Sequence, residues 1–220
     1  MGHTVHPYSF RVGVLRDWKS RWFKNKFYRE YLKSDVTLRE WLSKRLRGMY
    51  IADIEIERGE NEMNLILKTS RPGLLIGRGG EGIEKLRKEI TAVSQKEKLN
   101  LPKNFKISVQ EIRFPEAQAR IVAQMIAEDL QKRMSFRRIL NQTIEKVMAN
   151  KDVKGVKLAL SGRLDGAEMA RYEWLKRGQV PLTTLRADID FAKERAHLPY
   201  GDLGIKVWIY KGEVFEKQAK

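Results

Sequence analysis

The sequence predicts an α+β protein of two domains: a first domain with elements in the order α-β-β-α-α-β, and a second with two helices packed on a four-stranded, mainly antiparallel sheet. Three observations support this prediction. Short segments alternate apolar and polar residues, as half-buried strands do, while longer segments repeat their apolar residues at helical spacing. Phe114-Pro115 separates the two series of elements. Two helices followed by four strands are typical of helices covering one face of an antiparallel sheet.

The segment 1–35 is basic and rich in aromatic residues. It carries eight basic side chains against three acidic ones, and its aromatic residues are interleaved with them. One interpretation is an amphipathic helix that packs its aromatic rings on a core and leaves its cations in water. Another is a basic arm that follows a phosphate backbone. The two interpretations are compatible, because they use opposite faces.

The first domain is predicted to begin with a helix and a hairpin. The helix starts with the capping box Thr37-x-x-Glu40 and ends before Gly48. Alternating runs at 52–56 and 63–67 flank a turn at Gly59, which predicts a β-hairpin with one wet face.

The first domain continues with two helices and a strand. A short helix at 73–77 and a longer one at 81–97 flank a glycine-rich loop, and period-two alternation returns at 105–112.

In the second domain, Pro115 opens a helix whose apolar stripe consists of Val122, Ile126 and Leu130. Ser135 is in position to cap a second helix, and four alternating runs predict four strands. The predicted division is therefore a segment 1–35, a domain 36–114, a domain 115–212 and a tail 213–220.

The composition restricts the function. The net charge of the 220 residues is +16, which suggests a polyanionic partner, with nucleic acid first and an anionic membrane second. The chain has no cysteine, so disulfides and thiolate metal sites are excluded, as is typical of a reducing cytosol. His3, His6 and His197 are too scattered for a zinc site. No apolar run approaches the ~18 residues that span a bilayer, and no secretion signal is present.

The glycine-rich stretch from Gly77 to Gly82 suggests close approach to a phosphate. It satisfies the dinucleotide pattern G-x-G-x-x-G, but the strand before it and the acidic residue ~20 positions later are missing. A tight helix–helix turn is a second alternative. The third is a G-x-x-G loop, Gly77-Arg78-Gly79-Gly80, on which KH domains hold about four nucleotides, with bases lying against Ile76 and Ile83. The order α-β-β-α-α-β is that of a type II KH domain, so we favour this interpretation.

Four segments of the chain are distinctive: "VHPYSFRVGV", "RPGLLIGRGGEGIEKLRKEI", "SGRLDGAEMARYEWLKRGQVPLTTLRADIDFA" and "AHLPYGDLGIKVWIYKGE". With these segments the chain resembles the family of the third small-subunit ribosomal protein, over essentially its whole length and most closely in its bacterial form. The two C-terminal segments are far more specific than the loop.

The resemblance implies a non-enzymatic, cytoplasmic component of the head of the small ribosomal subunit. Its implied partners are small-subunit rRNA, mRNA in the tunnel by which message enters, and the second, tenth and fourteenth small-subunit proteins. It implies no cofactor, metal, membrane or small-molecule substrate. The main alternative is a free KH-type regulator that acts off the ribosome.

Three sets of site residues are predicted. The KH-loop set is Gly77, Arg78, Gly79, Gly80, Arg71 and Lys85. The mRNA set, which the resemblance implies, is Lys132, Arg133, Arg137 and Arg138. Within it, Arg133 and Arg137 are i and i+4 neighbours. The rRNA set is Arg11, Lys19, Arg21, Lys24, Lys26, Arg163, Arg171, Arg177 and Arg186.

Some features weaken these predictions or offer other interpretations. The four cations of the mRNA set could also form a helical face that is simply exposed to solvent. Asn141 and Gly79 stand where the family often has basic residues, which reduces the expected charge in the tunnel and the loop. We expect Tyr172 and Trp174 to belong to the core of the second domain.

A catalytic function is not expected. Asp188 and Asp190 form a carboxylate pair on one strand, but no histidine or metal motif accompanies them. No nucleophile elbow or P-loop motif appears in the chain.

Overall fold

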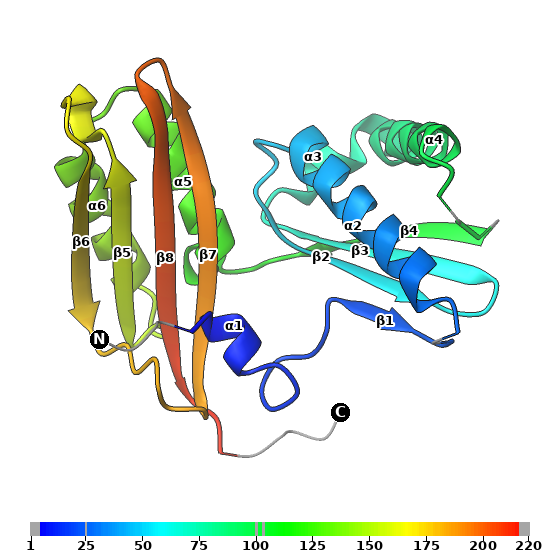
Figure 1. Cartoon of the computed structure of the whole chain (residues 1–220), viewed down its shortest axis with the longest axis horizontal. Coiled ribbons are helices and arrows are strands. Elements are labelled where there is room, and N and C mark those ends of the chain that lie inside the picture. Colours follow the sequence, from blue (N-terminus) through cyan, green and yellow to red (C-terminus); the bar gives the residue numbers. More distant parts are fainter. Residues whose placement is uncertain (1–4, 25, 100, 103, 216–220) are drawn as a thin grey trace. The chain divides into compact units, whose positions relative to one another are not determined.

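The computed structural model describes residues 5–24, 26–99, 101–102 and 104–215. These form two compact units (Figure 1). One contains Trp18–Arg113, and the other contains the described residues up to Asp17 together with those from Phe114 onward. The predicted segment 1–35 is thus shared between the units. Residues 216–220 of the predicted tail lie outside the described residues, as does His3.

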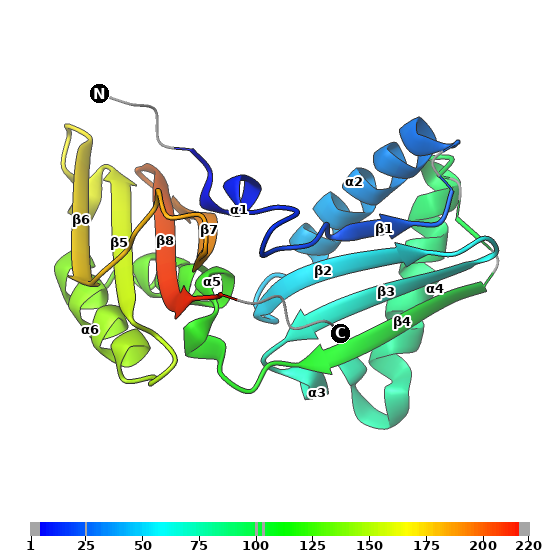
Figure 2. The ribbon, with the colours of Figure 1, turned by 90° about the horizontal axis from the view of Figure 1, so that it is seen from below.

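The unit 18–113 has a mixed sheet with the strand order β1-β2-β3-β4. The strands are β1 (Ser20–Trp22), β2 (Ile51–Arg58), β3 (Glu62–Thr69) and β4 (Asn104–Glu111). β2 and β3 form the predicted hairpin, and β4 pairs parallel to β3. Helices α2 (Tyr28–Arg45), α3 (Pro72–Ile76) and α4 (Glu81–Lys96) lie on one face of this sheet, as Figure 2 shows. The order of the elements from α2 onward is the predicted α-β-β-α-α-β.

Two local predictions in this unit were wrong. The helix begins at Tyr28 rather than at Thr37, and the Thr37 hydroxyl donates to the Lys33 carbonyl oxygen at 2.9 Å. The capping-box pattern therefore occurs in a helix interior, where threonine bonds to the preceding turn. In addition, residues 20–22 form strand β1, parallel to β2, which the alternation pattern did not reveal.

A buried carboxylate joins β1, α2 and β2. Oδ1 of Asp35 accepts hydrogen bonds from Arg58, with Nε at 2.9 Å and Nη2 at 2.6 Å. Oδ2 accepts from the Ser20 hydroxyl at 2.8 Å and from Trp22 Nε1 at 2.9 Å. The aromatic segment is thereby fixed to the sheet by a polar network as well as by its rings.

The second unit has an antiparallel sheet with the strand order β6-β5-β8-β7. The strands are β5 (Gly155–Gly162), β6 (Arg171–Gly178), β7 (Ala187–Leu198) and β8 (Gly201–Glu213). Helices α5 (Ala119–Gln131) and α6 (Phe136–Met148) lie behind the sheet in Figure 1. This arrangement confirms the predicted α+β layers.

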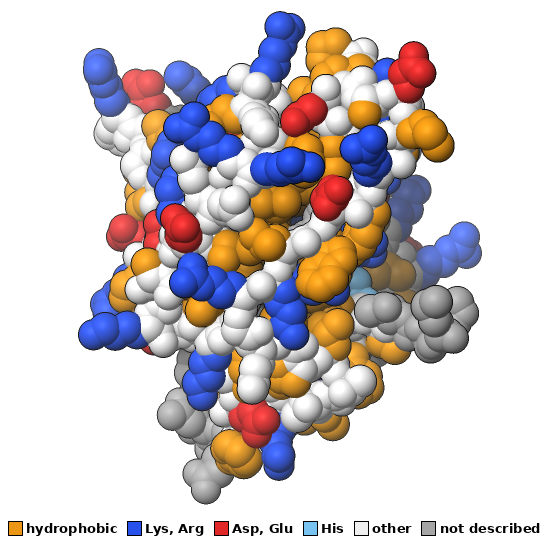
Figure 3. All heavy atoms as spheres, turned by 90° about the vertical axis from the view of Figure 1, so that its left-hand side faces the viewer, with side chains coloured by type: hydrophobic (Ala, Val, Ile, Leu, Met, Phe, Trp, Pro, Cys, Tyr) orange, Lys and Arg blue, Asp and Glu red, His pale blue; other side chains and the backbone are white. Residues whose placement is uncertain are grey.

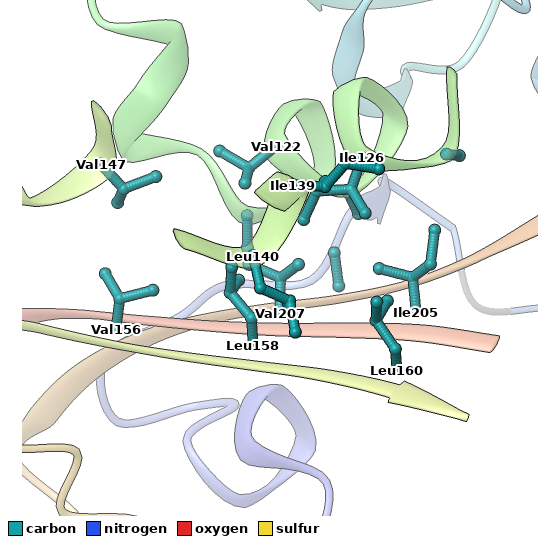
Figure 4. Packing of buried hydrophobic residues seen from close by; sticks show 14 of the residues in the cluster. Val122, Ile126, Ile139, Leu140, Val147, Val156, Leu158, Leu160, Ile205 and Val207 are labelled. Carbon is teal, nitrogen blue, oxygen red and sulfur yellow. The ribbon is translucent and has the colours of Figure 1, made fainter. Parts of the chain in front are cut away.

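The core of this unit lies between its helices and its sheet. Figure 4 shows Val122 and Ile126 of α5 and Ile139 of α6 facing Leu158 and Val207 of the strands. All of these side chains are buried. Helix α5 therefore buries the apolar stripe that the sequence predicted, and α6 buries Ile139, Leu140, Ile144 and Val147.

Other polar groups in this unit support the helices. Oδ2 of Asp190 accepts a hydrogen bond from the Ala119 backbone N–H at 2.8 Å, at the start of α5. Asp188 pairs with Arg16 at 2.6 Å. The two carboxylates that stood out in the sequence therefore have structural partners.

Candidate nucleic-acid interface

The glycine loop connects α3 to α4 through backbone conformations that favour glycine. Gly77 has φ 71°, Gly79 φ 59° and Gly80 φ 86°. A side chain at Gly79 would meet nothing within 4 Å, so this glycine is required by its backbone conformation rather than by crowding. The loop is exposed at Gly77, Arg78 and Gly79.

A further glycine brings the two helices together. A Cβ atom at Gly82 would lie 2.4 Å from the Leu75 carbonyl oxygen, so any larger residue would push α3 away from α4. Leu74 and Ile76 of α3 are exposed beside the loop, whereas Ile83 of α4 is half-buried. The loop thus presents open backbone beside apolar side chains, which suits a nucleotide chain with unstacked bases.

The charges around the loop are mixed. Arg71 is exposed, and its guanidinium lies 4.4 Å from the centroid of the Tyr50 ring. Lys85 is exposed too, but it pairs with Glu81 at 3.5 Å in the first turn of α4. Arg78 is exposed in the loop itself. The contact between Tyr50 and Arg71 could not be predicted from spacing in the sequence, because Tyr50 lies before β2 and only the fold brings it close to Arg71.

The dinucleotide alternative does not fit this geometry. Leu74, Leu75 and Ile76 belong to the short helix α3 rather than to a strand. The loop therefore lacks the strand–turn–helix context that a pyrophosphate site of that class requires.

The four cations of the mRNA set are all exposed at the junction of α5 and α6. Lys132 follows the last turn of α5 and pairs with Asp129 at 3.3 Å. Arg133 lies in the turn with φ 60°, so it shares no continuous helix with Arg137. Arg137 and Arg138 lie in the first turn of α6, and the Arg137 guanidinium is 5.6 Å from the Phe136 ring centroid.

Acidic groups reach this junction from elsewhere in the chain. Ser135 occupies the N-cap position but makes no side-chain capping bond. Instead, Oδ1 of Asp165 accepts from the Phe136 backbone N–H at 3.4 Å. The mRNA set therefore has a carboxylate nearby that the local sequence does not contain.

Most Lys and Arg side chains in and beside β1 form ion pairs with Asp and Glu side chains of the β2–β3 hairpin. Lys19 pairs with Asp53, and Lys24 pairs with Glu60. A hydrogen bond from Lys24 lowers the pKa of Glu60.

Arg21 contacts Glu57 at 2.6 Å and Glu55 at 3.1 Å. The hydrogen bond to Glu57 is the main cause of a raised pKa for Arg21. Lys26 is exposed in the turn before α2.

Arg11 is buried, and its guanidinium binds backbone carbonyls. Nε donates to Ala187 at 2.6 Å, Nη1 to Pro7 at 2.9 Å, and Nη2 to Thr184 at 2.9 Å and Leu182 at 3.0 Å. Burial lowers the pKa of Arg11, and Asp188 acts in the opposite direction. The predicted RNA contact does not fit this position, because the side chain has no accessible surface.

The arginines of the second unit differ from one another. Arg163 binds its own loop, with Nε donating to the Ala167 carbonyl at 2.9 Å and Nη1 to that of Tyr200 at 3.2 Å. Arg186 is exposed but pairs with Glu213 at 2.9 Å. Arg171 and Arg177 are exposed at the two ends of β6.

The described residues contain neither a metal-binding cluster nor a membrane-spanning helix. No group of three or more His, Asp or Glu side chains in that part of the chain is arranged to hold a metal ion. Among its helices, none combines the length and the apolar character needed to cross a membrane.

Comparisons with known proteins match both units. The KH domain profile matches residues 37–117, and the profile described as Ribosomal protein S3, C-terminal domain, matches residues 126–209. The protein of Lawsonia intracellularis named small ribosomal subunit protein uS3 is 46% identical over 221 residues, covering 100% of both chains. The uS3 protein of Caldicellulosiruptor bescii is 44% identical, covering 100% of this chain and 96% of its own. The relatives carry the name of a ribosomal protein, in agreement with the prediction of a non-enzymatic chain, and the chain belongs to the small ribosomal subunit protein uS3 family.

Proposed function

We propose that the chain is an RNA-binding component of the small ribosomal subunit that holds rRNA through its KH loop and lines the path of mRNA with the junction of α5 and α6. The observation that carries the proposal is the loop 77–80, with its exposed backbone and left-handed glycines between two helices. Such a loop lets sugar and phosphate approach the main chain without meeting Cβ atoms.

The loop residues have distinct roles in this proposal. Gly77, Gly79 and Gly80 contact the backbone of the nucleotide chain, and Arg78 supplies a positive charge beside it. Arg71 and Lys85 flank the loop. Lys85 contributes less, because Glu81 already neutralises part of its charge.

The cations of the mRNA set act as a group on the phosphates of the message. Arg133, Arg137 and Arg138 are exposed, and none of them is held by a carboxylate at salt-bridge distance among the described residues. Asn141, which follows these arginines in α6, adds no charge to the group. We therefore assign to the group the binding of message rather than its unwinding.

The rRNA set is reduced by the structure. Lys26, Arg171 and Arg177 stay as proposed contacts because they are exposed. Lys19, Arg21 and Lys24 bind RNA only if it displaces the acids of the hairpin. The resemblance also suggests the second, tenth and fourteenth small-subunit proteins as neighbours, and these contacts are a proposal.

The KH loop is tested by Gly79→Asp, which places a negative charge where the backbone is open. Aspartate tolerates the left-handed region, and a Cβ at this position meets nothing within 4 Å. The matched control is Gly13→Asp in the other unit, since Gly13 also has a positive φ (83°) and open space for a Cβ.

We expect Gly79→Asp to weaken binding of the purified chain to small-subunit rRNA and Gly13→Asp to leave it unchanged. Equal affinities for the two variants would contradict the role of the loop. Assembly is tested separately, by sedimentation of the tagged chain with small subunits at moderate salt. A chain found mainly off the ribosome would contradict the whole proposal.

The mRNA set is tested by the double variant Arg137→Ala/Arg138→Ala. Its control, Lys146→Ala/Lys151→Ala, removes the same charge from exposed positions at and beyond the other end of α6. We expect the first double variant to assemble normally but to slow translation through a stable mRNA hairpin. Equal rates through the hairpin in both double variants would remove this assignment.

A further inference from the structure

One face of the sheet in the second unit is not covered by α5 and α6. Val156, Leu158 and Leu160 of β5 point into the core beneath the helices, so Lys157, Ala159 and Ser161 lie on the opposite side. We call this opposite side the outer face. It is the face of the sheet turned toward the viewer in Figure 1.

Strand register defines which residues share the outer face. The successive rows across β6, β5, β8 and β7 are Lys176–Lys157–Trp208–Phe191, Trp174–Ala159–Lys206–Lys193 and Tyr172–Ser161–Gly204–Arg195. These rows, all in the described part of the chain, contain no Asp or Glu. Two of the acids of the same strands, Glu173 and Glu194, pair with Leu160 and Ile205 on the helix side. These three rows of the outer face therefore carry cations and no carboxylate, whereas the helix side of β6 carries both Glu173 and Arg177.

Two aromatic rings are exposed on this face. Tyr172 is 54% exposed and Trp174 is 53% exposed, so the prediction that they belong to the core was wrong. They lie two residues apart on β6, which is an edge strand without a neighbour on its other side. Adjacent exposed aromatic rings of this size are typical of a binding surface.

A lysine lies beside both tryptophans of the face. Lys157 Nζ lies 5.0 Å from the Trp174 ring centroid and 5.3 Å from that of Trp208. Trp208 is 6% exposed, and its Nε1–H has no hydrogen-bond partner among the described residues. The ring of Trp208 therefore belongs to the buried part of this face, and Trp174 is the tryptophan that a ligand can reach.

We propose that the outer face, at β6 and β5, binds single-stranded RNA by stacking unpaired bases on Trp174 and Tyr172, while Lys157, Lys176 and Lys206 bind the adjoining phosphates. An open sheet that combines exposed rings with cations is a general solution for unpaired nucleotides. A duplex is disfavoured because the faces of its bases are already stacked.

The charge of the face favours RNA over a protein. The cores of protein interfaces are depleted in lysine, whereas the three rows named above contain Lys157, Lys176, Lys193 and Lys206 and no carboxylate. A carboxylate, Asp202, follows one row further along β8, where it is paired with His197. Figure 3 shows the side of this unit on which β6 lies, where Lys and Arg side chains, with some Asp and Glu side chains, are spread among exposed apolar ones. The inference shares with the proposed function the premise that the chain binds RNA, but it uses neither the KH loop nor residues 132–138.

The test uses the full chain carrying Gly79→Asp, so that the KH loop contributes little. Its affinity is measured by fluorescence anisotropy for an oligouridylate of about 12 nucleotides and for an RNA duplex of about the same length. The variants are Trp174→Ala, Trp174→Phe and the control Leu175→Ala, whose side chain lies on the helix side of the same strand. Thermal melts verify that each variant is folded.

We expect Trp174→Ala to weaken oligouridylate binding about tenfold, because each stacked base contributes this order of affinity. Trp174→Phe retains most of the affinity, and Leu175→Ala and duplex binding are unchanged. Lys176→Gln lowers the salt slope by about 0.7 for the single strand, whereas Trp174→Ala leaves it unchanged. Equal affinities of Trp174→Ala and its parent for the oligouridylate would overturn the inference. So would a Trp174→Ala variant that loses affinity for another small-subunit protein while its affinity for RNA is unchanged.

Photo-crosslinking of a 4-thiouridine oligonucleotide to the unmodified chain separates this inference from the proposed function. Crosslinks in residues 172–176 support the outer face. Crosslinks confined to residues 71–85 would overturn the outer face and leave the KH loop in place. Crosslinks in neither segment would contradict both the outer face and the KH loop, and crosslinks at residues 132–138 would support only the mRNA set.

Discussion

Arg58 and Asp35 form an ion pair with 3% and 0% of their side chains exposed, in which Arg58 Nη2 lies 2.6 Å from Asp35 Oδ1. The same Nη2 lies 2.6 Å from the Ser34 hydroxyl oxygen, and the Arg58 guanidinium is 5.1 Å from the Tyr31 ring centroid. Removal of one partner of such a pair leaves an uncompensated buried charge. The pair therefore has more influence on stability than the surface pairs nearby.

We predict that Asp35→Ala lowers the free energy of unfolding of the unit 18–113 by about 3–5 kcal/mol. Lys24→Ala, which breaks an exposed pair of the same unit, changes it by less than about 1 kcal/mol. Urea denaturation of each variant measures these values. A similar small loss for both variants would contradict the prediction. Asp35→Leu/Arg58→Met is expected to be more stable than Asp35→Leu alone.

The second prediction concerns Arg11, which ties the N-terminal segment to residues 182–187 through backbone carbonyls. Arg11→Lys keeps the charge but cannot form a planar fork, so buried carbonyls lose their donors. We expect faster hydrogen exchange of the backbone amides at 8–16 and a loss of about 2 kcal/mol in the second unit. Arg16→Lys, at a partly exposed pair, serves as the control. Unchanged exchange in Arg11→Lys would show that the segment is held by other contacts.

The third prediction separates two kinds of glycine at the loop. Gly82→Ala forces a Cβ to within 2.4 Å of a backbone oxygen, whereas Gly79→Ala adds strain only through its positive φ. We expect losses in the free energy of unfolding of about 3 kcal/mol for Gly82→Ala and about 1 kcal/mol for Gly79→Ala. Thermal unfolding of the two variants provides the comparison, and the reverse order would show that α3 moves freely against α4.

The fourth prediction concerns pH. Glu89 of α4 accepts two hydrogen bonds from Arg45 of α2, at 2.7 Å and 2.9 Å, and the hydrogen bond lowers the pKa of Glu89. Because the folded chain binds this proton less readily than the unfolded chain, the pair stabilises the fold above about pH 4.3. The contribution is lost as the pH falls through the lowered pKa.

Glu89→Gln should therefore be less stable than the parent chain at pH 6, and the difference should shrink toward pH 3. Guanidinium denaturation is unsuitable for this measurement because its salt screens the pair, so urea is used. A difference that stays constant with pH would assign the effect to packing.

Regular alternation and helical spacing made most of the fold predictable. The hairpin of β2 and β3 and the strand β4 follow directly from period-two patterns. The strand β1 was missed because it has three residues and owes its place to pairing with Ile56, Glu57 and Arg58, which lie far along the chain. The same segment supplies the aromatic rings that were interpreted as a helix face.

The candidate site was predictable where it depends on local backbone. The loop 77–80 required only glycines before a helix. Tyr172 and Trp174 were assigned to the core because aromatic residues on a strand usually face one, and the sequence does not show which face of a sheet its helices cover. Arg11 was assigned to RNA because all but one of its acceptor carbonyls lie 170–176 residues away in the chain.

The acceptors of Arg11 also determine when the second unit is complete. During synthesis, residues 18–113 emerge with every strand of their own sheet and can mature early. Residues 5–17 leave the exit channel before the unit 18–113, yet their binding surface at 182–187 is made much later. They are therefore among the last residues to dock, and a nascent chain must keep the apolar side chains of this segment from other contacts until then.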